Sequence, residues 1–274
     1  VDESGTTDTF TVVLDAQPSD NVVIAMSSSD IGEATISGTI SFTPANWDTP
    51  QTVTVTGVDE NTIDGDQTST ITITIVDSIS DSDFSNVADQ TVSVVTTDDD
   101  AAGFTIEETE GATEVDESGT TDTFTVVLDA QPTSDVVLTI TSDDTGEATV
   151  NSPLTFTPVN WDTPQTVTVT GIDEDIVDGT ITSTITIAVD DANSEDDFDV
   201  VVDQTVSVDT TDDDAAGFTI VELDGATEVD ESGTTDTFTV VLDAQPTSDV
   251  VLTVTSDDTS EATVNSPLTF TPVN

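Results

Sequence analysis

The charge of this chain limits its folding more than any other feature, because 58 of its 274 residues are Asp or Glu and none is Lys, Arg or His. No side chain can neutralise a carboxylate, so the counter-charge has to come from dissolved cations or bound metal ions. Two carboxylates about 4 Å apart repel by roughly 1 kcal/mol in water and about 4 kcal/mol at the dielectric constant of a protein surface. Folded domains are typically stable by only about 5–15 kcal/mol, so we expect a saline or metal-containing medium.

The apolar residues nevertheless follow the pattern of a folded chain. Val and Ile alternate with Thr in Thr52–Gly57 (TVTVTG) and in Thr70–Val76 (TITITIV), which is the period of a strand with one buried face. Thr is β-branched and uncharged, so it suits the solvent side of strands in so acidic a chain. High net charge alone is typical of disorder, but this alternation favours ordered β-structure.

A long internal repeat divides the chain. The decapeptide VDESGTTDTF begins at Val1, Val115 and Val229, which are 114 residues apart. Residues 115–160 and 229–274 differ at two positions only, where Ile140 becomes Val254 and Gly146 becomes Ser260. A period of this length matches one globular domain and is too long for a solenoid. We expect a repeat without its first strand at residues 1–100, a complete repeat at 101–214 and a partial repeat, with the first four strands, at 215–274.

The array does not contain a whole number of repeats, and two explanations remain open. One is that the sequence is an excerpt of a longer chain. The other is that a neighbouring subunit donates the missing strands, as in donor-strand complementation.

Seven strands are predicted in the complete repeat from its period-two runs and the turn residues between them. They cover residues 103–108, 121–129, 136–142, 153–157, 165–172, 181–189 and 204–211. Seven short strands in about 110 residues are typical of an antiparallel immunoglobulin-like sandwich. The predicted fold is therefore all-β, a tandem array of seven-stranded sandwiches with Phe124, Leu128, Phe156 and Trp161 in the core of the complete one.

Acidic residues are concentrated at one end of this predicted sandwich. Alternate loops of sequentially antiparallel strands lie at opposite ends, so three acidic loops should meet the end of the last strand. Their acidic residues are Asp116, Glu117, Asp144, Glu147, Asp173, Glu174 and Asp178, and the last strand ends with Asp212, Asp213 and Asp214. Calcium takes about six to eight oxygen ligands in irregular geometry, whereas zinc and softer metals prefer nitrogen and sulfur. We therefore predict a calcium site at this end of each repeat.

The repeat also resembles a known family, the Calx-β domain, a calcium-binding sandwich of sodium/calcium exchangers and bacterial surface proteins. The resemblance spans the whole repeat and rests on DTFTVVLD (residues 122–129), LTFTPVNWDTPQTVTVTGIDE (154–174), the acidic loop that follows and the closing DDD. It implies calcium ligands in the complete repeat at Glu117, Glu147, Glu174, Asp178, Asp212, Asp213 and Asp214. It implies their counterparts in the first repeat at Glu3, Glu33, Glu60, Asp64, Asp98, Asp99 and Asp100.

Three further residues complete the set of candidate ligands: Asp59 and Asp173 in the acidic loops, and Glu231, which is the third-repeat counterpart of Glu117. One position departs from the family. A second acidic residue commonly stands three positions after the first in this loop, but Gln67 and Ile181 follow Asp64 and Asp178. We therefore expect fewer ions or weaker binding than in the family.

Several functions are opposed by the composition. Without His, Cys, Lys, Arg or Tyr the chain lacks most bases, nucleophiles and cations of enzymes, and we expect no enzymatic activity. Paired carboxylates can hydrolyse glycosides, but two Trp and no Tyr leave little aromatic surface for a sugar. The net charge opposes binding to nucleic acids or anionic membranes. We also expect no disulfide, no membrane span and no signal peptide in this stretch.

The function that we expect is structural. Calcium at each acidic end would fix the angle between repeats of an extracellular filament, stalk or giant adhesin at a cell surface. The expected partners are neighbouring repeats and copies of the same chain, and strand donation is one way to join them. The alternative is a ligand- or carbohydrate-binding adhesion module, in which residues 77–89 and 190–203, which differ between copies, would carry the recognition surface.

Overall fold

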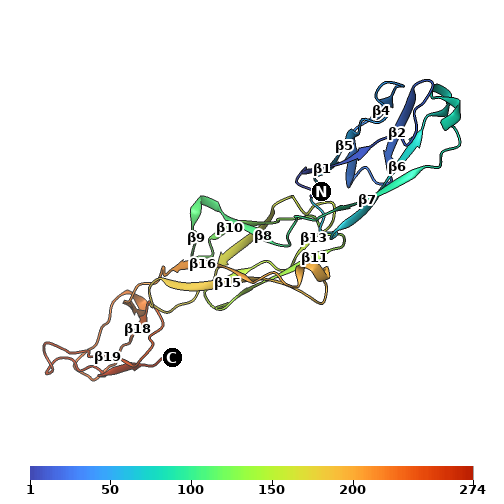
Figure 1. The fold of residues 1–274 in the computed structure, drawn as a ribbon. Coiled ribbons are helices and arrows are strands. Elements are labelled where there is room, and N and C mark those ends of the chain that lie inside the picture. Colours follow the sequence, from blue (N-terminus) through green and yellow to red (C-terminus); the bar gives the residue numbers. More distant parts are fainter. Residues whose placement is uncertain (274) are drawn as a thin grey trace.

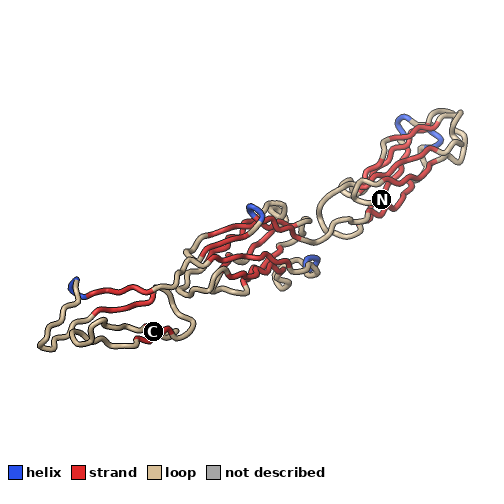
Figure 2. Tube along the Cα trace, turned by 90° about the vertical axis from the view of Figure 1, so that its left-hand side faces the viewer, coloured by secondary structure: helices blue, strands red, loops and turns tan. Residues whose placement is uncertain are grey.

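The computed structural model describes residues 1–273, apart from the side chains of Glu110 and Asp224, and consists of β-strands with short 3-10 helices. Figures 1 and 2 show an elongated molecule in which three groups of strands follow one another in sequence order. Within residues 1–273, every sheet takes its strands from a single repeat. The all-β class predicted from the sequence is confirmed.

In the middle repeat two sheets enclose one core. The first sheet has the order β12-β14-β10-β8, and the second has the order β13-β11-β15-β16-β9, in which β9 runs parallel to β16. The strands are β8 (Phe104–Glu108), β9 (Thr113–Asp116), β10 (Thr121–Leu128), β11 (Val136–Ser142), β12 (Ala148–Val150), β13 (Leu154–Phe156), β14 (Gln165–Gly171), β15 (Ile181–Val189) and β16 (Gln204–Thr211). The 3-10 helices are η3 (Thr109–Gly111) and η4 (Asp196–Phe198).

The alternation along each strand decides which residues form this core. Phe124, Leu128 and Phe156, predicted as core residues, are at most 3% exposed, and all three belong to one cluster that draws on both sheets. Trp161 is half-buried and packs against the same cluster. Its backbone carbonyl accepts the N–H of Leu128 at 3.2 Å, which agrees with the predicted packing role.

The predicted count of seven strands is wrong, because the middle repeat has nine. The two additional strands, β9 and β12, lie at sheet edges, where the chain changes from one sheet to the other. After β8 has paired with β10, η3 leads to β9 on the second sheet; after β12 has paired with β14, the chain crosses to β13. The first crossing includes Gly111 at φ +86°, a conformation that glycine adopts at little cost. Strands of three or four residues are too short to show a period.

The first repeat has sheets of the same kind with fewer strands, in the orders β1-β5-β3 and β4-β2-β6-β7. Its elements are β1 (Thr7–Val12), β2 (Val22–Ser28), β3 (Ala34–Ile36), β4 (Thr39–Phe42), β5 (Gln51–Gly57), β6 (Gln67–Ile75), η1 (Asp77–Ile79), η2 (Ser82–Phe84) and β7 (Gln90–Thr96). Its buried apolar residues form two separate clusters instead of one.

The third repeat consists of two separate strand pairs, β17-β18 and β19-β20. Its elements are β17 (Phe218–Glu222), η5 (Leu223–Gly225), β18 (Phe238–Leu242), β19 (Val250–Leu252) and β20 (Leu268–Phe270). In the described part of the chain, no helix is long and apolar enough to cross a membrane.

Candidate metal centre

Glu117 is the residue around which the acidic side chains of the middle repeat gather. It follows β9 in a turn, in which the Asp116 carboxylate accepts the N–H of Ser118 at 2.8 Å and the Glu117 N–H is bonded to the Thr211 carbonyl at 3.1 Å. Its side chain is 0% exposed, and neither carboxylate oxygen has a hydrogen-bond partner. A buried, unpartnered carboxylate is costly, so this site calls for a cation or a proton.

Two groups of carboxylates share Glu117. The first group joins it to Glu174 and Asp178 in the loop between β14 and β15, and the second joins it to Asp212 and Asp214 after β16. Within each group the ligand oxygens all lie within 4.8 Å of one another. Segments far apart in the sequence therefore meet at one end of the sandwich, as the loop topology predicts.

The first repeat has the same arrangement around Glu3, which is also 0% exposed with both oxygens unpartnered. Here the loop group is larger, because Glu33, which lies between β2 and β3, joins it. The two groups are Glu3, Glu33, Glu60 and Asp64, and Glu3, Asp98 and Asp100. The shared members stand 114 residues apart in the two repeats, so the same acidic positions come together in both.

Asp212 fixes the acidic loop to the end of β16. Its Oδ2 accepts the backbone N–H groups of Asp178 at 3.0 Å and Gly179 at 2.8 Å, and its Oδ1 accepts that of Asp214 at 2.7 Å. These bonds, the one from Gly179 first, lower the pKa of Asp212. Gly179 has φ +80°, so a side chain there would be strained. The loop ligands are thus held in place by a residue that belongs to the other group.

Burial and mutual repulsion disfavour the charged forms of the central carboxylates. Burial raises the pKa of Glu117 to about 7, repulsion from Asp212 adds to the shift, and the nearby backbone N–H of Asp213 opposes it. Burial, then repulsion from Asp98, raises the pKa of Glu3 to about 7 as well. A divalent cation bound among these oxygens would stabilise their charged forms and remove the penalty.

Most of the predicted ligands lie in these clusters. The members are Glu3, Glu33, Glu60, Asp64, Asp98, Asp100, Glu117, Glu174, Asp178, Asp212 and Asp214. Glu147 is outside the groups but borders them. It is 6% exposed, its Oε2 has no partner, and burial followed by repulsion from Asp178 raises its pKa.

The remaining candidates are not brought into a cluster. Asp59, Asp99, Asp173 and Asp213 are exposed. In the closing triplets the first and third residues turn inward and the second outward, as the alternation of an extended backbone requires. Glu231 is exposed too, and among the described residues it belongs to no acidic group.

One residue of the site was missed by the sequence analysis. A Cβ atom on Gly171 would lie 2.2 Å from the backbone oxygen of Asp116, the residue before Glu117, so only glycine allows this approach. Gly57 has the same relation to Asp2 at 2.1 Å. A glycine that ends a Val-Thr alternation is the available signal, because glycine in a strand often marks close backbone contact.

The acidic loop that carries Glu60 and Asp64 also contacts the next repeat. The sequence predicted that this end faces the next repeat, but not which residues make the contact. Between Glu60 and Asp64, the Asn61 carbonyl accepts the backbone N–H of Gln131 at 2.6 Å, and the Ile63 side chain packs against the core of the middle repeat. The Gln131 side chain donates to the Pro158 carbonyl at 2.7 Å, which holds its own loop in place.

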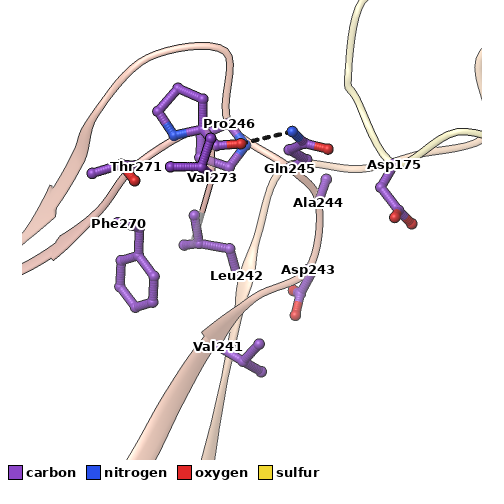
Figure 3. A pocket seen from close by; sticks show the side chains of 11 residues that line it. Asp175, Val241, Leu242, Asp243, Ala244, Gln245, Pro246, Phe270, Thr271 and Val273 are labelled. Atoms are coloured by element: carbon purple, nitrogen blue, oxygen red, sulfur yellow. Dashed lines mark hydrogen bonds between the residues drawn. The ribbon is translucent and has the colours of Figure 1, made fainter.

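The second junction repeats the backbone contact of the first. The Gln245 N–H donates to the Asp175 carbonyl at 2.5 Å, and Ile176 forms a β-bridge with Gln245. Figure 3 shows Gln245 beside Asp175, with its side-chain amide bonded to the Pro272 carbonyl at 2.8 Å. In both junctions the contact is formed by residues that lie between two candidate ligands, namely Asn61 and Ile63 in the first and Asp175 and Ile176 in the second.

Comparisons with known proteins assign no family. No protein-family model matches the chain, and no curated protein matches it. Similar solved structures include domains 4 and 5 of the S-layer protein SbsC, with 18% identity, a TM-score of 0.35 and coverage of 69% of this chain and 70% of that chain. The calcium binding domain CBD12 of CALX1.1 has 17% identity, a TM-score of 0.30 and coverage of 66% and 73%.

The apo form of the Calx CBD1 domain has 18% identity and a TM-score of 0.30, and the match covers 40% of this chain and 98% of that domain. At these identities and TM-scores the likeness assigns no function to the chain. The functional conclusion has to come from the carboxylate clusters and the junctions.

Proposed function

We propose that the repeats bind calcium at the Glu3 and Glu117 clusters, and that the bound ions stiffen the junctions of an extracellular or cell-surface array. One observation carries this proposal: Glu117 is wholly buried with two unpartnered carboxylate oxygens, in a chain without Lys, Arg or His. The chain has no cationic side chain that could compensate such a charge. A cation from the medium can.

The ligand atoms favour calcium. Each cluster offers carboxylate oxygens only, and the loop group has four members in the first repeat and three in the middle repeat. Calcium accepts about six to eight oxygens in irregular geometry, whereas magnesium requires a near-ideal octahedron and retains its waters. Because Glu117 belongs to both groups of its repeat, it would bridge two neighbouring ions.

The stiffening follows from the position of the ligands. Glu60 and Asp64 flank the residues that contact Gln131 of the next repeat, and Asp98 and Asp100 belong to the linker that leads into it. An ion bound to both segments would restrict the loop and the linker together. A ligand that binds only this ordered state stabilises it by about 2.7 kcal/mol at a hundred times its dissociation constant.

The proposed location follows from the affinity expected of such modules. Extracellular calcium modules have dissociation constants of roughly 10⁻⁴–10⁻³ M, which match calcium outside cells and not inside them. A tandem array of near-identical repeats then suits a stalk or filament, since each junction would fix the same orientation between successive repeats.

Calorimetric titration with calcium tests the proposal, with Glu117→Gln as the variant and Glu107→Gln as the control. Glu107 is an exposed carboxylate on β8 of the same repeat. We expect Glu117→Gln to weaken binding by the middle repeat at least about tenfold, because a charged ligand to the ion is lost. Glu107→Gln should bind as the wild type does. Equal affinities in both variants, at low and high sodium, would mean diffuse screening in place of a site.

A further inference from the structure

Two hydroxyl groups are buried in the middle repeat close to the Glu117 cluster. The Ser183 and Thr210 side chains are 0% exposed, and within the described residues neither hydroxyl has a hydrogen-bond partner. The alternation along β15 and β16 places them on the buried face of the sheet, in line with apolar residues such as Ile185 and Val208. A buried hydroxyl without a partner costs free energy, so an apolar side chain would be more stable at both positions unless the hydroxyls bind something.

The sheet register places both hydroxyls near Glu117. The strands β15, β16 and β9 are neighbours in one sheet (Figure 1). Ser183 pairs with Val208, so Ser183 and Thr210 are diagonal neighbours on the buried face. On the other side of β16, Thr210 lies opposite Val115, two residues before Glu117, which makes Glu117 a diagonal neighbour of Thr210 too. The Cα atoms of such neighbours are about 7–8 Å apart, and one bridging water can span the gap between their side chains.

The hydrogen-bonding capacities of the three groups are complementary. The charged Glu117 carboxylate only accepts hydrogen bonds, and each hydroxyl has a proton to donate. A water molecule can accept bonds from Ser183 and Thr210 and donate one to Glu117. It would then make three hydrogen bonds, the typical number for a buried water in a protein. A single water therefore satisfies both hydroxyls and one carboxylate oxygen.

The first repeat has the same pair of hydroxyls beside its buried glutamate, Glu3. The counterparts Ser69 and Thr96 are both 0% exposed, and the Ser69 hydroxyl has no partner among the described residues. Thr96 donates to the Glu33 carbonyl at 3.4 Å, which is long for a hydroxyl hydrogen bond. The hydroxyl pair thus accompanies the buried glutamate in both repeats.

We propose that Ser183 and Thr210 hold one water against the Glu117 carboxylate, and that this water orients the carboxylate for calcium. The inference rests on the proposed function. The ion takes the lone pairs that face the neighbouring carboxylates, and the water takes one that faces the sheet. Ser183 and Thr210 are thus positioning residues that act through Glu117. Groups that hold a metal ligand in place typically change metal affinity by about 10–100-fold when they are lost.

Calorimetric titration of the 274-residue chain with calcium tests this role. Thr210→Val keeps the shape of the side chain and Ser183→Ala is a second removal of a hydroxyl. We expect each to weaken binding by the middle repeat by about tenfold or more, while the first repeat keeps its affinity. Thr210→Ser retains the hydroxyl and should bind as the wild type does. Ser207→Ala is the matched control, because Ser207 is exposed on the outer side of β16.

Melting curves separate this role from a packing role. Thr210→Val and Ser183→Ala should lower the melting midpoint more in saturating calcium than in chelator, because what they lose is ion binding. Wild-type affinity in both variants, an equal loss of affinity in Thr210→Ser, or equal midpoint losses in the two media would each overturn the inference and leave the calcium site itself in place. If the wild type binds no calcium, the inference and the proposed function are both wrong.

Discussion

At the scale of single residues, Asp81 shows that a carboxylate can stabilise this acidic chain without any ion. It is 6% exposed, and its Oδ2 accepts the backbone N–H groups of Ser19 at 2.6 Å and Asp20 at 3.0 Å. Its Oδ1 accepts that of Asp83, also at 3.0 Å. Nothing in the sequence distinguished it, because two of its donors are the backbone groups of Ser19 and Asp20, about 60 residues away. In the middle repeat Glu195 fills this position and accepts the N–H of Thr133 at 2.8 Å.

Replacement of Asp81 by Asn should destabilise the first repeat in a pH-dependent way. Its hydrogen bonds, the one from Asp83 first, lower the pKa of Asp81 from 3.8 to about 2. A depressed folded-state pKa gives a contribution that is complete above the unfolded value and lost as the pH falls through about 2. Calorimetric melting at stepwise pH should show a lower midpoint for Asp81→Asn than for the wild type at pH 7, and this difference should narrow in acid. The control Asp77→Asn changes an exposed residue and should melt at the same midpoint as the wild type.

Glu117 predicts the opposite pH dependence for the ion-free protein. Its pKa in the folded state is about 7, above the ordinary 4.5. Between these two pH values the folded state therefore keeps a proton that the unfolded state has already lost. In chelator, stability should therefore fall as the pH rises from about 5 to above 7. In saturating calcium it should fall with acid instead, because protons compete with the ion for the carboxylates. Melting curves with the same pH slope in both media would contradict an ion bound at Glu117.

At the scale of strands and loops, the contact between Gly171 and the turn after β9 positions the cluster. Gly171→Ala would place a methyl group 2.2 Å from the Asp116 oxygen, so the turn that carries Glu117 has to move. We expect a loss of about 1–3 kcal/mol in the free energy of unfolding, as for other overpacked sites, together with weaker calcium binding. Urea denaturation with and without calcium measures both effects.

Gly146→Ser is the control for this substitution. Serine occupies the equivalent position 260 in the third repeat, and a Cβ at Gly146 meets only an Asp144 carboxylate oxygen at 3.1 Å. Its unfolding free energy should match that of the wild type. A loss as large as that in Gly171→Ala would show that any added side chain disturbs the loops.

The elements also show how far the sequence determines the structure. Long strands such as β14 and β15 are predictable, because seven or nine residues of alternation identify both the strand and its buried face. The meeting of Asp178 and Asp212 is predictable from the order of antiparallel strands, whereas Glu117 reaches the same end because β9 runs parallel to β16. The strands β9 and β12 are not predictable, because they are short and defined by the sheet that they join.

The contacts between repeats were beyond sequence reasoning for a different reason. The bonds from Gln131 to Asn61 and from Gln245 to Asp175 join backbone atoms, so no particular side chain is required to form them. The sequence could predict that the carboxylate cluster faces the next repeat. Its mechanical connection through Ile63 and Gln131 became visible only when both loops were placed.

At the scale of the whole molecule, two junctions of the same kind predict a single mechanical response. Each joins a carboxylate cluster to a backbone contact with the next repeat, so ion release should loosen both together. The chain in Figure 1 should then change from an extended rod to a flexible string of the same folded units.

Removal of calcium by a chelator should therefore lower the melting midpoint and broaden the distribution of shapes. At calcium a hundred times above the dissociation constant, the lost stabilisation of about 2.7 kcal/mol corresponds to roughly 10 °C or more for a domain of this size. Small-angle scattering should show a shorter maximum dimension and a more disordered profile in chelator, while sodium at matched ionic strength should not restore the rod. If the scattering profiles with and without calcium coincide, the ions stabilise single repeats only and the junctions are stiff by their backbone contacts alone.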